Sequence, residues 1–186
     1  MSNFQHTVGL YQAAGIPGSI ASTADLVSLA KGRIAAVDLP FGHFCWLGQD
    51  SNTVTNVGTD GVKPLGYVIH TKESQIYNVK DEVTGSYPAG MNVEVIVQGH
   101  MYGAAPTAAK AGQKVFANIA DGSVAVGDAG AKVDGAVETD FFVETDAEAN
   151  EAFIMTNFGP VPKAATAPAP PAGGDNTNSD NSKTGK

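Results

Sequence analysis

The sequence has very few residues of the kinds that cross-link a chain or bind polyanions. Cys45 is the single cysteine among 186 residues, so no disulfide can form within the chain. Lys and Arg number 11 against 19 Asp and Glu, for a net charge of −8, and the basic residues form no run. Because nucleic-acid binding needs a clustered basic surface, this composition argues against DNA or RNA as a partner. Folding must therefore depend on packing or on assembly.

Long hydrophobic segments are absent as well. No apolar run approaches the roughly 20 residues that cross a bilayer, so we expect no membrane partner. The first eighteen residues, MSNFQHTVGLYQAAGIPG, contain no basic segment followed by an apolar core, which argues against a signal peptide. We expect the protein to be made and kept soluble in a cytoplasm.

The composition changes sharply after Phe158. The remaining segment has five prolines followed by a Gly, Asp, Asn, Ser and Lys run, and no aliphatic residue larger than Ala beyond Val161. Such a segment cannot bury enough surface to offset its ordering entropy. It is either a spacer or a dispensable terminus. We therefore divide the chain into an N-terminal arm (1–18), a β-rich body (19–159) and a flexible Pro/Ala-rich, then polar, tail (160–186).

Short apolar alternations rich in β-branched and aromatic residues predict strands in the body. They lie at 33–39, 43–47, 66–71, 93–99, 114–119, 123–127, 134–145 and 152–158. Asp121 and Gly122 lie between two of them and predict a hairpin turn, because Gly tolerates positive φ. The stretch STADLVSLAKG (22–32) has helix-capping residues at both ends and allows one short helix or turn. The fold class is all-β, a small barrel or sandwich of antiparallel strands.

Catalytic and metal-binding motifs are missing from the sequence. It contains no phosphate-binding loop and no nucleophile elbow. The four histidines (His6, His43, His70, His100) are scattered, and only His43 lies near Cys45. Two ligands do not make a metal site, and Cys45 between Phe44 and Trp46 is typical of a small buried residue. We expect no enzyme activity, no catalytic residue, no metal and no cofactor.

An acidic stretch without Lys or Arg extends from Asp134 to Glu151. Its carboxylates are Asp134, Glu138, Asp140, Glu144, Asp146, Glu148 and Glu151. Four of them fall at even spacing around Phe142, which is typical of a strand with one polar face. That face meets either solvent or a basic partner surface. A catalytic pair or a Ca²⁺ site is the third possibility, although no calcium-loop motif is present.

Four ordered motifs resemble the structural cement, or capsid decoration, proteins of tailed phages. AGQKVFANIADGSV followed by GAVETDFFV is similar to that family's hairpin and the strand after it. VGLYQAAGIPGSIAS resembles its opening, and HFCWL and PLGYVIHT occupy the places of two intervening strands. Ser19, His43 and Ile69 depart from the family pattern. The resemblance covers residues 8–158.

This resemblance implies a viral structural protein on the outer surface of a tailed-phage head, synthesised in the host bacterial cytoplasm. Such a subunit stabilises the capsid lattice by bridging neighbouring copies of the major capsid protein, and members of the family are commonly homotrimers. The apolar residues of the arm are the candidates for a capsid or inter-subunit contact: Phe4, Val8, Leu10, Tyr11, Ile16 and Pro17. The same residues could instead form the first strand of the subunit's own body.

A carbohydrate-binding β-module is the alternative from a different class. Its hallmark is a set of exposed aromatic side chains on one β-face, which Tyr67, Tyr77, Tyr87 and Tyr102 could supply. The lack of a signal peptide and the single thiol weigh against a secreted module.

Overall fold

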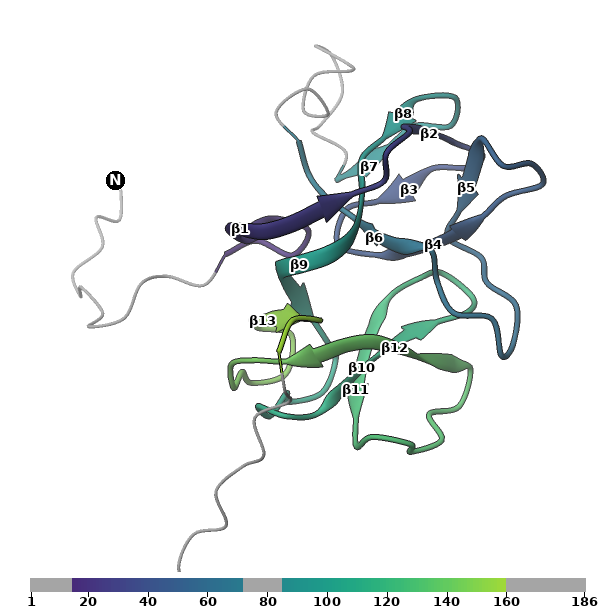
Figure 1. Ribbon diagram of the computed structural model, residues 1–186. Helices are drawn as coiled ribbons and strands as arrows, with labels where there is room; N and C mark the ends of the chain where they lie inside the picture. Colours follow the sequence, from purple (N-terminus) through teal and green to yellow (C-terminus); the bar gives the residue numbers. More distant parts are fainter. Residues whose placement is uncertain (1–14, 72–84, 160–186) are drawn as a thin grey trace, which may run out of the picture.

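The computed structural model describes residues 15–71 and 85–159, and all regular secondary structure in these ranges is β-strand (Figure 1). The predicted all-β class is confirmed. The tail (160–186) and residues 1–14 of the arm lie outside the described residues.

Thirteen strands, most of them short, make up the described chain. They are β1 (Ile20–Ser28), β2 (Arg33–Ala35), β3 (Leu39–Pro40), β4 (Phe44–Leu47), β5 (Thr53–Thr55), β6 (Gly66–Val68), β7 (Ser86–Tyr87), β8 (Asn92–Val93), β9 (Val95–Ala104), β10 (Lys114–Asn118), β11 (Val124–Gly127), β12 (Ala136–Val143) and β13 (Ala152–Thr156).

Eleven strands form one sheet, in the order β11-β10-β12-β13-β9-β6-β4-β5-β2-β8, with β1 also paired to β9. The strands β3 and β7 form a separate two-stranded sheet. The pairs are antiparallel except for β2 and β5, which run parallel. Since the path begins at β11 and ends at β8, the sheet does not close into a barrel.

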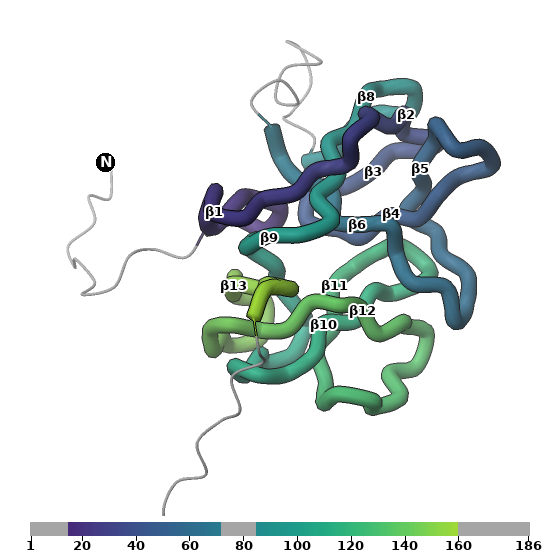
Figure 2. The backbone as a smooth tube through the Cα atoms, viewed as in Figure 1, coloured from purple at the N-terminus to yellow at the C-terminus, as the bar shows by residue number. Residues whose placement is uncertain are grey.

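The long strand β9 joins the two halves of the molecule (Figure 2). Near its start, Val95 and Ile96 pair with β6, and from His100 to Ala104 it pairs with β13. Strand β1 pairs with β9 as well, between Ile96 and Met101. One half therefore contains β2 to β8, and the other contains β10 to β13.

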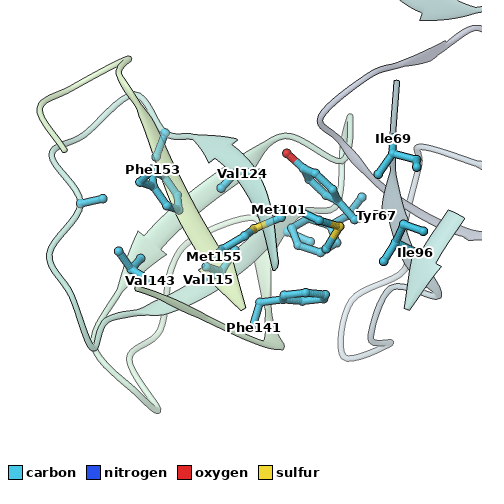
Figure 3. Close-up of a cluster of buried hydrophobic side chains, with 14 of the residues drawn as sticks. Tyr67, Ile69, Ile96, Met101, Val115, Val124, Phe141, Val143, Phe153 and Met155 are labelled. Atoms are coloured by element: carbon cyan, nitrogen blue, oxygen red, sulfur yellow. The ribbon is translucent and has the colours of Figure 1, made fainter. Parts of the chain in front are cut away.

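Two clusters of buried side chains stabilise these halves. The larger cluster extends through both, since it combines Phe44, Tyr67 and Ile96 with Val115 and Phe153 (Figure 3). The smaller cluster lies within the first half and includes Leu39, Cys45 and Val54. Because one cluster crosses β9, we expect the two halves to unfold together.

The possible helix at 22–32 is a wrong prediction. The chain forms β1 there, and Ile20, Ser22, Val27 and Ser28 are paired with β9. The register shifts along this pair, and Asp25 has a φ of 56° within it. Ser, Thr and Asp favour bulged and turned backbone as readily as they favour helix caps. Pairing with the long β9 strand therefore prevails over the capping signals.

Candidate capsid-contact surface

The base of the N-terminal arm is anchored to the body by backbone hydrogen bonds. The Gly18 N–H donates to the Tyr102 carbonyl at 2.9 Å, and the Gly18 carbonyl accepts from the His70 N–H at 2.8 Å. A Cβ on Gly18, whose φ is +86°, would lie 2.6 Å from the Gly42 nitrogen. Two glycines are needed where these backbones meet, so the point at which the arm leaves the body is rigidly placed.

The chain lies against the body just before this anchor. A Cβ on Gly15 would lie 2.3 Å from the ring of Tyr102, so the chain packs closely on that ring. The next side chain, Ile16, is 77% exposed, and Pro17 is half-buried. The other arm candidates, Phe4, Val8, Leu10 and Tyr11, lie outside the described residues. Ile16 and Pro17 are the two candidates that the structure describes, and of these Ile16 is exposed.

A second apolar surface lies along β5, on the side of the first half opposite the start of β1 (Figure 1). Val37, Leu47 and Val57 are exposed by 41%, 52% and 54%. They line a groove of about 610 Å³ together with Thr53 and Thr55 of β5. The sequence does not reveal this surface, because Leu47 lies at the end of a strand and Val37 and Val57 lie in the connections that follow strands. Their periodicity therefore does not reveal that they share one groove.

The acidic carboxylates mostly face solvent. Glu138 is half-buried, and the other six side chains of the stretch are exposed: Asp134, Asp140, Glu144, Asp146, Glu148 and Glu151. Three basic side chains pair with members of this set. Lys63 Nζ lies 2.5 Å from Asp140, Lys110 Nζ lies 3.7 Å from Asp146, and His100 Nδ1 lies 3.1 Å from Glu144.

A bulge in β12 modifies the even spacing on which this interpretation rested. Lys114 of β10 is opposite Phe142, but Phe116 is opposite Glu138, so two extra residues of β12 lie between these pairs. The buried Thr139 stabilises the bulge, since its hydroxyl donates to the Val115 carbonyl at 2.8 Å. The bulge brings Phe141 and Phe142 both into buried positions.

The residues considered for metal binding make other contacts. The ring of His43 lies before β4, with Nδ1 2.9 Å from the Asp121 carbonyl oxygen. Cys45 is fully buried, and burial raises the pKa of its thiol to about 12. Within residues 15–71 and 85–159, no group of three or more His, Cys, Asp or Glu is placed to hold a metal ion. No helix in these ranges is long and apolar enough to cross a membrane.

Asp121 and Gly122 lie in the connection between β10 and β11, beside the start of β4. Gly122 has a φ of +75°, and its carbonyl accepts a hydrogen bond from the Phe44 N–H at 2.7 Å. The Asp121 carboxylate accepts from the Ser123 N–H at 2.9 Å. The hydrogen bond between Phe44 and Gly122 thus connects the two halves of the sheet, although β4 is not paired with β10 or β11.

The aromatic face needed for a carbohydrate-binding module is not formed by the described tyrosines. Tyr67 is fully buried and its hydroxyl donates to the Tyr102 carbonyl at 2.9 Å. Tyr87 is 3% exposed, with its hydroxyl on the Ile69 carbonyl. Tyr102 is half-buried against Gly15, and Tyr77 lies outside the described residues. The side chains proposed as a glycan platform are therefore core residues in two of three described cases.

Comparison with protein families gives one match over most of the chain. The phage family described as "Structural cement protein (E217 gp24/Pam3 gp6)" matches residues 4–157. The chain belongs to this family of phage structural cement proteins. The cement protein is accordingly a structural component of the phage virion and is associated with the capsid.

One solved phage structure has a similar fold. A chain in the capsid of Myoviridae phage XM1 is similar to the cement protein with a TM-score of 0.56 at 16% identity, and the match covers 84% of this chain and 98% of that one. The N base of head fiber gp8.5 of bacteriophage phi29 aligns at a TM-score of 0.41 and 13% identity, over 70% and 92% of the two chains. At that score the second likeness carries no argument. No curated protein sequence matches the chain.

Proposed function

We propose that the cement protein binds the outer surface of the assembled head and bridges neighbouring copies of the major capsid protein. The match to the cement family over residues 4–157 is the observation that carries this proposal. In this role the chain is a homotrimer without enzyme activity, and it needs neither metal nor cofactor. In this proposal the body (19–159) is the folded module, flanked in sequence by the arm (1–18) and the tail (160–186).

Binding to several capsid proteins at once explains how the cement protein stabilises the shell. A subunit that contacts several capsid proteins at once gains from multivalency only when those proteins are already arranged in a shell. It therefore binds the shell better than it binds free capsid subunits, and its binding free energy is added to the stability of the shell. We expect the same preference for expanded heads, in which the bridged positions are in place.

The arm is the segment that we assign to contacts between subunits. Its base is held at Gly18 by two backbone hydrogen bonds, so the apolar residues before it are joined to the body at a defined point. Ile16 already exposes most of its side chain there. The burial of such side chains contributes about 25 cal/mol per Å² of apolar area, whereas the tail has little apolar surface to bury.

Co-sedimentation with bare heads of the same phage tests this function. We expect the intact chain to sediment with heads and to raise the temperature of genome release in a thermal ramp. Removal of residues 1–14, which leaves the Gly18 anchor intact, should weaken binding on the order of tenfold. Removal of residues 160–186 is the matched control and should change binding by less than about twofold.

Two results would contradict the proposal. If the intact, folded chain does not sediment with heads, the protein is not a cement subunit of that capsid. If the tail deletion weakens binding more than the arm deletion does, the contact has been assigned to the wrong end of the chain.

A further inference from the structure

The groove between β4, β5 and the segment after β2 has no occupant among the described residues. Val37, Leu47 and Val57 line it and remain between two-fifths and just over half exposed. Exposed aliphatic side chains gathered around one hollow are typical of a surface that another chain covers. The hollow of about 610 Å³ is large enough for several side chains.

The groove is almost without charge. Asp50 is the one charged residue of its lining, and its carboxylate already accepts a hydrogen bond from the Asn52 N–H at 2.7 Å. Strand β5 is paired with β4 on one edge and with β2 on the other. A ligand of this groove therefore packs against side chains and does not extend the sheet. The chemistry that fits is a neutral segment with an apolar face.

The sequence before Gly15 has this chemistry. The segment MSNFQHTVGLYQAA contains no Asp, Glu, Lys or Arg, whereas the chain as a whole has 30 such residues, from 11 basic and 19 acidic. In an extended conformation, Phe4, Val8 and Leu10 would share one face with His6, because all four occupy even positions. Gln5, Thr7 and Gly9 would lie on the other face. Residues 4–10 then span roughly 20 Å at about 3.3 Å per residue.

The position of the arm base favours a segment from another subunit. The arm leaves the body beside the start of β1, and Figure 1 shows β5 on the opposite side of the same half of the molecule. We propose that residues 4–10 of one copy dock in the Val37–Leu47–Val57 groove of a second copy. This contact goes beyond capsid binding, since it links cement subunits to each other and forms without the head.

Cross-linking between two different chains tests this contact directly. One chain carries Val8→Cys and the other, with a size tag, carries Val57→Cys; the native Cys45 is fully buried and does not compete. The control partner carries Val27→Cys, because Val27 is 43% exposed but lies on β1, away from the groove. The experiment uses free protein without heads. We expect the yield of the disulfide between Val8→Cys and Val57→Cys to be about tenfold higher than the yield between Val8→Cys and Val27→Cys.

A binding measurement provides a second readout. Leu47→Asp should raise the Kd of self-association on the order of tenfold, because it places an unpaired carboxylate against the docked segment. Val27→Asp introduces the same charge outside the groove and should leave that Kd within about twofold. Circular dichroism of both variants establishes that they fold.

Three outcomes would overturn the proposal. They are equal cross-linking at Val57 and Val27, a monomeric chain at every accessible concentration, and a disulfide that forms within one chain when both substitutions are combined at high dilution. The assay uses no heads, so its failure leaves the co-sedimentation result, and with it the capsid function, intact.

Discussion

Gly122 offers a sharp test of how the two halves of the sheet are connected. It adopts a φ of +75°, and a Cβ added there would lie 2.2 Å from the Phe44 carbonyl oxygen. This overlap is with backbone, so it cannot be relieved by rotation of a side chain. The Gly122 carbonyl also accepts the Phe44 N–H at 2.7 Å, so displacement of the turn removes this hydrogen bond as well.

The expected loss of stability can be estimated from these terms. A positive φ costs Ala about 1 kcal/mol relative to Gly. Loss of the backbone hydrogen bond costs about 1 kcal/mol more, and displacement of the buried Phe44 adds at least another 1 kcal/mol. We therefore expect Gly122→Ala to lower the free energy of unfolding by about 3 kcal/mol, which corresponds to a Tm lower by roughly 6–12 °C.

Gly130 is the matched control for the backbone term. Its φ is +74°, and a Cβ there would meet nothing within 4 Å. Gly130→Ala should therefore cost about 1 kcal/mol, or roughly 2–4 °C in Tm. Urea unfolding and calorimetry of both variants measure the difference. If the two substitutions agree within about 0.5 kcal/mol, the Gly122–Phe44 contact does not stabilise the fold and the reasoning is refuted.

Two further predictions concern titratable groups. Cys45 is fully buried and burial raises its pKa to about 12, so Ellman's reagent at about pH 8 should label it only after unfolding; rapid labelling of the folded protein would show that the first half opens. Partial burial raises the pKa of Asp121, but hydrogen bonds from Ser123 and the nearby His43 outweigh this and leave it below 3.8. Its contribution to stability is therefore present above pH 3.8 and is lost as pH falls through the lowered folded pKa. Asp121→Asn should be less stable than the parent at about pH 7 and equal to it in strong acid, and a difference independent of pH would contradict this assignment.

Local patterns in the sequence were sufficient to predict most of the sheet. The β-branched and aromatic residues at 93–99 and 114–119 form strands because they pack well on a pleated, half-buried surface. The division between the body and 160–186 rests on composition, since that segment has almost no aliphatic or aromatic side chains to bury, and it stays a prediction. The family was recognisable because four short motifs follow one another in a fixed order over residues 8–158, and the family match covers 4–157.

Nonlocal contacts decided what the sequence could not show. β1 is a strand and not a helix because it forms an antiparallel pair with β9, more than sixty residues later in the chain. The bulge at Thr139 depends on the Val115 carbonyl of another strand, so the alternation read along β12 is interrupted there. Val37, Leu47 and Val57 form one groove only after β2, β4 and β5 have paired. Periodicity reports the neighbours of a residue along the chain, whereas a binding surface is defined by neighbours in space, and these are fixed by the pairing of distant strands.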